Sequence, residues 1–482
     1  MNGYDTTILE ANNRPGGLCT SWKRMGYTID VGIYGMLGTT PEHPLFEIWN
    51  ELIDMNQLKF QCPSALTVYE LAPGKRLTLY CDPERLQHSM ETIAPEDRSV
   101  IRDFVKGIRA LRNLEMPVRK PKEFYNFLDY LRMGRALPAL SVVRKWLKVS
   151  PLDFADQFQN PFLREALRHM SSPVLNDMYV MSAAGLGAFG YPLCGSFGLA
   201  SLIERKYREL GGYARYNSPV SRVIVGNDAA QGVELTGGET LTADLVVSTA
   251  DGNSTIYGLL DGQYVDQKLE DLYQTLPISP SRILVSIGIG RKMDEMPPRM
   301  TIVLSRPLRI SDGRSYGSIE VRVMDHVSEA APSGKSLLLV GMESTTHDYW
   351  AELRDRNWLF YQREKDRIAL AIIDILEERI GDIKDNIEMI DVATPSTFFR
   401  QTRNWKGSTH GWSQEQMFQA NPLGKELPRL RNFYMAGQWV EPGGGLHSAV
   451  KSGRDVAQII SRRDRKRSGL RSALANRLLN RH

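Results

Sequence analysis

The sequence predicts an α/β fold in which a discontinuous Rossmann-like domain is interrupted by an inserted α+β, partly helical domain. Three observations predict it. A short strand in residues 5–10 ends at an acidic residue and is followed by glycines. A run of apolar residues that ends in small ones occupies 243–250. A strand leads through a glycine-rich turn into a helix over 432–461. Because these segments lie at the start, middle and end of the chain, the residues between them are insertions.

The first segment resembles the second half of a dinucleotide-binding unit. Its β-branched and apolar residues predict a strand that ends at Glu10. In such a unit the Gly-x-Gly-x-x-Gly turn follows the first strand, and the acidic residue comes about 20 residues later. Only nine residues precede Glu10. We therefore expect the first strand and helix to be missing, and a misplaced start or a truncation to be the reason.

The residues that follow Glu10 fit a cofactor-binding turn. Gly16 and Gly17 allow the backbone to approach a ligand closely, and Arg14 offers a positive charge to a phosphate. The alternative is an ordinary strand and turn of any α/β protein.

The middle of the chain alternates between helical and strand periodicity. Helices are expected at 45–58, 197–210 and 358–380, and the region 95–168 is expected to be largely helical. Strands are expected at 219–225, 232–235, 240–242, 283–289, 318–323 and 337–342. The run 243–250 is expected to be a buried parallel strand whose carboxyl end approaches a ligand. The second α+β stretch covers roughly 280–395.

The third segment places three glycines at the start of a helix. Gly443, Gly444 and Gly445 precede Leu446, so free backbone N–H groups and the positive helix end face whatever binds there. A phosphate loop is the alternative, but no Gly-Lys-Ser/Thr closes this run as a nucleoside triphosphatase requires.

The amino-acid composition excludes several classes of protein. The 482 residues, 42% hydrophobic and 24% charged, predict an ordinary soluble protein with two to four domains. The net charge of +4 comes from residues 462–482, which hold eight Lys or Arg and one Asp. A nucleic-acid-binding surface is therefore not indicated. Leucines at every fourth position of this tail fit a basic amphipathic helix that contacts a membrane surface, but a solvated terminus is the slightly favoured interpretation.

Two further features concern the surroundings of the site. The uncharged run 178–203 is long enough to span a bilayer, but its five glycines and one proline favour a wall or loop beside an apolar cavity. The Met and aromatic residues at 170–191 are expected in the core rather than in the pocket. The four cysteines are widely spaced and the eight histidines form no pair, so no metal site is expected, and the protein is predicted to be cytoplasmic.

Taken in order, these motifs resemble the phytoene desaturase and carotenoid isomerase family of FAD-dependent oxidoreductases, within the amine-oxidase-like flavoprotein superfamily. The resemblance spans nearly the whole chain. It rests on Glu10, on 14–17, on the strands at 219–223 and 243–250, on 437–446, and on 393–397 followed by 407–412.

The resemblance implies an FAD-binding domain and a substrate domain. The FAD-binding domain is expected to comprise 1–60, 196–255 and 425–462, the substrate domain 61–195 and 256–424, and the basic tail 463–482.

The resemblance also implies roles for individual residues. Glu10 is expected to hold the adenosine ribose, Arg14, Gly16 and Gly17 the pyrophosphate, and Val223 the adenine; Gly437, Gln438, Gly445 and Leu446 are expected at the flavin end. A helix start there stabilises negative charge on the N1–C2=O edge of a reduced flavin. No catalytic side chain is assigned, because the flavin performs the redox step.

The sequence departs from the family pattern at three places. The glycine fingerprint is absent, Gln438 replaces a frequent acidic residue, and Ile33 and Tyr34 stand where a histidine commonly lies near the flavin. Of the histidines, only His410 and His447 are expected near the cofactor.

Three functions remain open from the sequence. The first is hydride transfer between flavin N5 and an apolar, polyene-like substrate, as desaturation, saturation or isomerisation. The second is amine oxidation. The third is a non-catalytic remnant, because the chain as written is expected to bind FAD weakly without its first strand.

Overall fold

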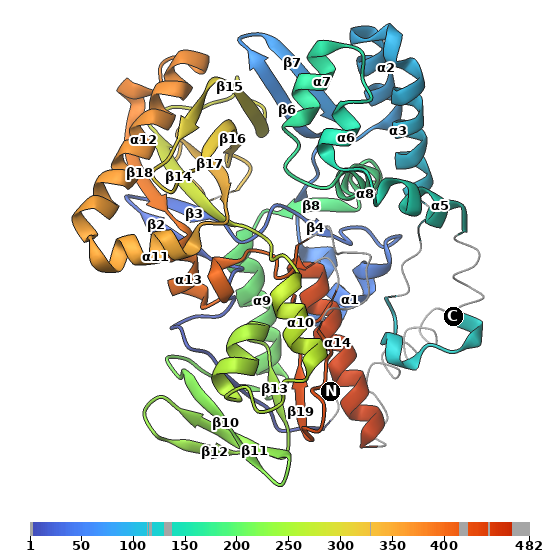
Figure 1. Cartoon of the computed structure of the whole chain (residues 1–482), viewed down its shortest axis with the longest axis vertical. Helices are drawn as coiled ribbons and strands as arrows, with labels where there is room; N and C mark the ends of the chain where they lie inside the picture. Colours follow the sequence, from blue (N-terminus) through green and yellow to red (C-terminus); the bar gives the residue numbers. More distant parts are fainter. Residues whose placement is uncertain are drawn as a thin grey trace.

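A seven-stranded mixed sheet occupies the upper part of the molecule (Figure 1). The computed structural model describes residues 3–112, 114, 118–129, 137–327, 329–413, 423–441 and 444–464. Neighbouring strands of the sheet are antiparallel, except that β15 and β6 are parallel. In spatial order the strands are β18 (Ile387–Ala393), β14 (Ser281–Ile289), β17 (Ser336–Ser344), β16 (Ser315–Val323), β15 (Arg299–Arg309), β6 (Ala65–Ala72) and β7 (Lys75–Tyr80).

One face of this sheet is apolar and packs against helix α12 (Trp358–Ile380). Ile283 and Val285 of β14 lie in the same buried cluster as Ile368 and Ile372 of the helix. Because side chains alternate along a strand, the residues between them point to the opposite face. Helix α11 (His347–Arg356) precedes α12 on this side of the sheet.

A group of helices covers the other end of the sheet, around β6 and β7 (Figure 1). Phe104, Trp146 and Phe154 form its centre, with the Phe104 and Phe154 rings 4.8 Å apart. Several of these helices begin at a capping side chain followed by proline, as at Asp82 and Asn160. The helices are α2 (Pro83–Ile93), α3 (Arg98–Leu111), α5 (Leu137–Trp146), α6 (Pro151–Ala155), α7 (Pro161–Arg168) and α8 (Val174–Ala184).

The lower part of the molecule contains two short parallel pairs and a three-stranded antiparallel sheet (Figure 1). Strand β1 (Thr7–Leu9) pairs with β9 (Tyr213–Arg215), and β13 (Val246–Ser248) pairs with β19 (Phe433–Met435). The antiparallel sheet consists of β10 (Val220–Gly226), β11 (Ala229–Leu235) and β12 (Thr240–Thr242).

Small sheets and helices connect the two parts. The sheets are β2 (Ser21–Arg24) with β3 (Tyr27–Asp30), and β4 (Met36–Leu37), β8 (Phe189–Pro192) and β5 (Phe60–Gln61). The helices are α1 (Pro44–Leu52), α9 (Gly195–Glu209), α10 (Gln267–Thr275), α13 (Pro395–Thr402) and α14 (Gly445–Arg463). Short helical turns are η1 (Met55–Gln57), η2 (Pro95–Asp97), η3 (Lys122–Phe124), η4 (Ser254–Leu259), η5 (Lys384–Asn386) and η6 (Trp405–Gly407).

The fold is mixed α/β with a large sheet, as expected from the sequence. The long helix at 358–380 and the strands at 283–289, 318–323 and 337–342 are confirmed. Four strands of the large sheet were not predicted: β6, β7, β15 and β18.

Two sequence-based expectations are corrected by the structure. The strand expected at 243–250 covers only Val246–Ser248 and is not fully buried, since Val247 is 42% exposed. Within the described part of the chain, β13 pairs only with β19, so it belongs to a two-stranded sheet and not to the interior of a wide parallel one. The helix expected at 45–58 ends at Leu52, because Ile53 is extended and Asp54 caps a separate turn.

The uncharged run 178–203 is mostly regular structure, and its residues Tyr179, Val180 and Phe189 line the cavity described below, as expected for a wall. It forms the end of α8, strand β8 and the first half of α9. Among the described residues no helix has both the length and the hydrophobicity needed to cross a bilayer. Most of the basic tail that fits a membrane-contacting helix lies outside the described residues, which end at Asp464.

Candidate functional site

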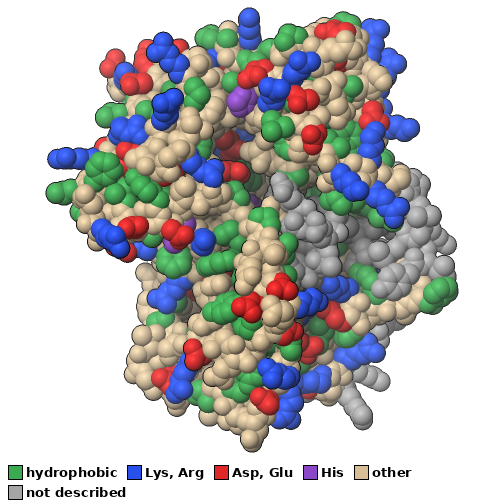
Figure 2. Space-filling view, viewed as in Figure 1, with side chains coloured by type: hydrophobic (Ala, Val, Ile, Leu, Met, Phe, Trp, Pro, Cys, Tyr) green, Lys and Arg blue, Asp and Glu red, His purple; other side chains and the backbone are tan. Residues whose placement is uncertain are grey.

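A cavity of about 1390 Å³ lies between the large sheet and the lower part of the molecule. It is lined from the first glycine turn, from the turn before α14, and from the sheet face opposite α12. Figure 2 shows the surface hollowed in this region, with acidic and basic side chains inside the hollow. Three segments that are far apart in the sequence therefore meet around one space.

The first wall is the turn that contains Gly16 and Gly17. The N–H of Cys19 donates to the carbonyl of Gly16 at 2.8 Å, which closes the turn. Gly16 has a φ of +116°, and a Cβ atom there would lie 2.2 Å from the carbonyl oxygen of Cys19. Only glycine fits this position. Arg14 lies over the ring of Phe197, 5.5 Å from its centroid, and also lines the cavity.

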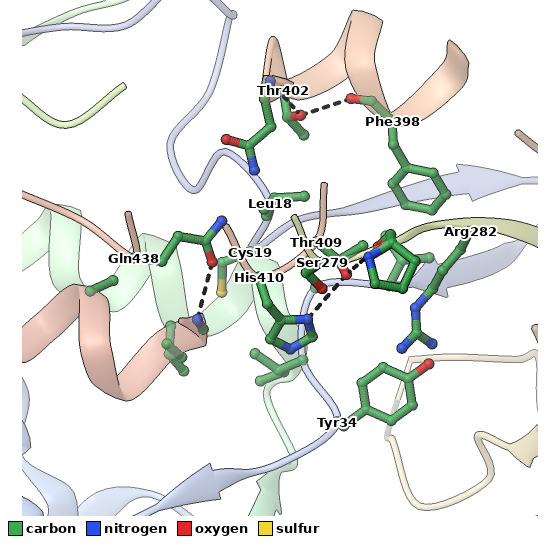
Figure 3. Close-up of a pocket in the computed structure, with 18 of the residues that line it drawn as sticks. Leu18, Cys19, Tyr34, Ser279, Arg282, Phe398, Thr402, Thr409, His410 and Gln438 are labelled. Atoms are coloured by element: carbon green, nitrogen blue, oxygen red, sulfur yellow. Dashed lines mark hydrogen bonds between the residues drawn. The ribbon is translucent and has the colours of Figure 1, made fainter. Parts of the chain in front are cut away.

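The second wall is the turn between β19 and α14. The N–H of Gly437 donates to the Ser452 hydroxyl at 2.8 Å, which ties the turn to the helix. The N–H of Gly445 donates to the side-chain carbonyl of Gln438 at 3.2 Å (Figure 3). Leu446 follows in the first helical turn and lines the cavity. The N-terminus of α14 thus points its partial positive charge at the cavity.

Seven of the nine predicted cofactor residues lie on the cavity wall: Arg14, Gly16, Gly17, Gly437, Gln438, Gly445 and Leu446. The other two lie outside it. The backbone N–H of Glu10 donates to the carbonyl of Arg215, and its carboxylate accepts the N–H of Asn12 at 2.8 Å. Val223 is buried in strand β10, in a cluster with Phe433.

Both histidines that were expected near the cofactor line the cavity. Nδ1 of His410 lies 3.0 Å from the hydroxyl of Thr409. Burial lowers the pKa of His410 to about 4, and the neighbouring charge of Arg282 acts in the same direction. Burial likewise lowers the pKa of His447 to about 4. Both imidazoles are therefore neutral at pH 7.

The neutral state of His447 makes stability depend on pH. In the unfolded chain a histidine binds its proton near pH 6.5, so acid favours unfolding once the pH falls below that value. The contribution of neutral His447 to the free energy of unfolding is fully present above about pH 6.5 and is lost as the pH falls toward 4. We expect His447→Gln to lose less free energy of unfolding between pH 7 and pH 5 than the parent protein, measured by urea denaturation. His88→Gln, at an exposed position of α2, is the control and should behave as the parent. Equal pH dependence for both variants would contradict the assignment.

The sheet contributes a third wall that sequence reasoning missed. Arg282, Arg299, Arg322 and Glu343 all line the cavity from strands of the large sheet. The signal was present in β16, where charged and apolar residues alternate. Glu320 and Arg322 lie between apolar residues that belong to the cluster facing α12, namely Ile319, Val321 and Val323. Such alternation marks a strand with one buried apolar face and one polar face.

The described residues offer no metal site. Within the ranges that the structure covers, no group of three or more His, Cys, Asp or Glu side chains could hold a metal ion. The four cysteines are free. Burial raises the pKa of the Cys19 thiol to about 12, so this cavity-lining cysteine is a protonated thiol rather than a nucleophile.

The glycine turns, the helix N-terminus and the size of the cavity fit an extended nucleotide cofactor. Residues 1–255 match the model of a family described as flavin-containing amine oxidoreductases. This chain belongs to that family. It is an FAD-dependent oxidoreductase.

Curated relatives are similar over nearly the whole chain. The chain is 26% identical to a chloroplastic prolycopene isomerase of Daucus carota, over 96% of this chain and 77% of the relative. It is 24% identical to a 4,4'-diapophytoene desaturase of Methylomonas sp., over 97% of this chain and 92% of the relative.

Solved structures share the fold. An oxidoreductase from Methanosarcina mazei aligns with a TM-score of 0.58 at 14% identity, covering 95% of this chain and 94% of the other. Wild-type putrescine oxidase bound to putrescine aligns with a TM-score of 0.59 at 14% identity, with the same coverage. At this identity the likeness supports the flavoprotein oxidase fold and nothing further about substrate.

Proposed function

We propose that this enzyme transfers a hydride between an apolar, carotenoid-like polyene and FAD, as a desaturation, a saturation or a redox-neutral isomerisation. The observation that carries the proposal is one continuous cavity that joins the glycine turns to an apolar wall. That wall comprises Leu66, Trp146, Leu175, Val180, Phe189 and Phe398. The similarity to a prolycopene isomerase and a diapophytoene desaturase over nearly the whole chain supports it.

The proposal assigns the cofactor residues as follows. Gly16 and Gly17 let the backbone approach the pyrophosphate, and Arg14 offers it a charge. Gly437, Gln438, Gly445 and Leu446 hold the flavin end, where the N-terminus of α14 favours negative charge. Glu10 and Val223 hold the adenosine. When bound, FAD supplies a two-electron acceptor and donor, and the side chains orient the substrate and exclude water.

The proposal also covers the domain division. The FAD-binding domain comprises 1–60, 196–255 and 425–462, and the substrate domain comprises 61–195 and 256–424. One seven-stranded sheet takes strands from both segments of the substrate domain, which supports grouping them.

An amine substrate is disfavoured by the charges of the cavity. Arg282, Arg299 and Arg322 line it, and an ammonium group would be repelled by them. Turnover of amines with release of peroxide, and none of polyenes, would overturn the proposal.

The proposal is tested with the purified chain and added FAD. We expect the flavin absorbance spectrum to shift when the chain is mixed with excess FAD, and prolycopene incubated with that mixture to change its chromatographic and absorbance profile. Protein without FAD is the control. A titration of the same chain with FAD also tests the expectation of weak binding. Tight, stoichiometric binding would contradict that expectation, and a folded protein that never shifts the flavin spectrum would contradict the assigned cofactor residues.

A further inference from the structure

Three arginines surround one tyrosine ring in the sheet wall of the cavity. The guanidinium carbons of Arg322, Arg282 and Arg299 lie 4.1, 4.4 and 5.3 Å from the ring centroid of Tyr34. They come from three strands of the large sheet, β16, β14 and β15, and all four residues line the cavity. Figure 3 shows the Arg282 guanidinium next to the Tyr34 ring, beside the segment that carries His410.

The charges of two of these arginines are not balanced. Arg299 donates to the carboxylate of Glu320 at 2.7 Å. Arg282 and Arg322 have no carboxylate within ion-pair distance in the part of the chain that the structure describes. Arg322 is 7% exposed, and its one hydrogen bond to a described residue is a long one, 3.4 Å, to the carbonyl of Ile33. A guanidinium remains charged in proteins, so this arrangement is costly without a counter-charge.

Burial makes the imbalance worse. It lowers the pKa of both Arg282 and Arg322, because it removes water from the charged form. The aromatic face of Tyr34 offers each of them a cation–π contact, which offsets only part of that cost.

Nearby acidic groups supply only part of the missing charge. Despite its burial, Arg299, Arg282 and Arg322 together hold the pKa of Glu320 below its usual range, so this one carboxylate is shared among three guanidinium groups and forms its ion pair with Arg299. Glu343 is the register partner of Arg282, yet no ion pair joins them, and burial raises the pKa of Glu343. Burial also raises the pKa of Asp177 to about 7. The carboxylate of Asp30 accepts the N–H and the hydroxyl of Ser196, and among the described residues it forms no ion pair with Arg282 or Arg322. The wall between Arg282 and Arg322 therefore keeps an excess of positive charge that faces the cavity.

We propose that Arg282 and Arg322 bind the carboxylate of a substrate that is otherwise an apolar chain. This deepens the proposed function and rests on it: the polyene carries an acid group at one end. A carboxylate brings one negative charge and accepts planar, charge-assisted hydrogen bonds from guanidinium. A diphosphate brings more charge than Arg282 and Arg322 balance, and the carboxylate of Glu320 on β16 would add to the repulsion.

The test compares an acid with its neutral analogue. Binding of all-trans-retinoic acid and of retinol to the FAD-saturated full chain is followed by quenching of tryptophan fluorescence. We expect the acid to bind about tenfold more tightly or better, since a hydrogen bond to a charged group is worth roughly that factor. Arg282→Gln and Arg322→Gln should each remove about tenfold of the affinity for the acid and leave retinol binding unchanged. Arg306→Gln, at an exposed position of β15, is the matched control and should change neither.

Each outcome decides the proposal. Equal binding of acid and alcohol to the parent protein overturns it, and that comparison needs no variant to fold. Arg282→Lys and Arg322→Lys keep the charge and should retain acid selectivity if the glutamine variants are unstable. Tighter binding of geranylgeranyl diphosphate than of the acid overturns the choice of carboxylate. Because binding is measured without turnover, acid-selective binding would support this inference even if no polyene is converted. Conversion of neutral polyenes without acid-selective binding would refute this inference and leave the proposed function intact.

Discussion

Replacing Gly444 with alanine is expected to lower the free energy of unfolding by about 3 kcal/mol and the affinity for FAD by about tenfold or more. Gly444 is the residue before α14, with a φ of +57°. A Cβ atom there would lie 1.8 Å from the carbonyl oxygen of His410. Both partners of this clash are backbone, so neither can move aside by changing a rotamer. The start of α14 would have to move away from the cavity, and the glycine cradle would open.

A second glycine of the same helix is the control. Gly453 has ordinary helical geometry and open space around its Cβ position. Gly453→Ala should raise stability by up to about 1 kcal/mol, because alanine favours helix more than glycine does. Urea denaturation and flavin titration measure both effects. Parent-like stability and FAD binding in Gly444→Ala would show that this turn is not the cofactor cradle.

Lys425→Met is expected to destabilise the protein by about 3 kcal/mol. Lys425 is 3% exposed, and its Nζ lies 2.9 Å from Glu441 and 3.3 Å from Asp455. Burial alone disfavours the charge of Lys425, but these carboxylates outweigh burial and raise its pKa. Removing the lysine leaves two buried acids, and among the described residues Lys451 is then the ion-pair partner that both of them keep. Glu441 lies in the turn before α14 and Asp455 on the helix, so the loss also loosens the cavity wall that this turn forms.

The matched control for this variant is a lysine in an exposed ion pair. Lys384 pairs with Asp374 at 2.7 Å, with both side chains more than half exposed. Lys384→Met should change the free energy of unfolding by less than about 0.5 kcal/mol. Guanidinium denaturation followed by tryptophan fluorescence compares the two. Equal small effects would mean that water reaches the Lys425 cluster and screens its charges.

Local patterns predicted much of the fold because they reflect local chemistry. The helix over 358–380 begins at a capping asparagine, Asn357, and ends at Gly381 with a φ of +79°. Both signals are carried by neighbouring residues and can be read without knowledge of the fold. By contrast, β15 contains Pro307 and several polar residues, so the alternation of apolar and polar residues that marks a strand is weak there. Its pairing with β16 and β6 makes it a strand.

The sequence by itself determined the glycine turns around Gly16 and Gly445 and the family to which they belong. Those features depend on backbone conformations that one or two residue types permit. Only the tertiary structure decided the character of the substrate wall. Arg282 and Arg322 are 40 residues apart, and nothing local relates them. The register of a sheet assembled from distant strands brings them to the same tyrosine ring, and burial, which removes water from both guanidinium groups, makes their unbalanced charge chemically important.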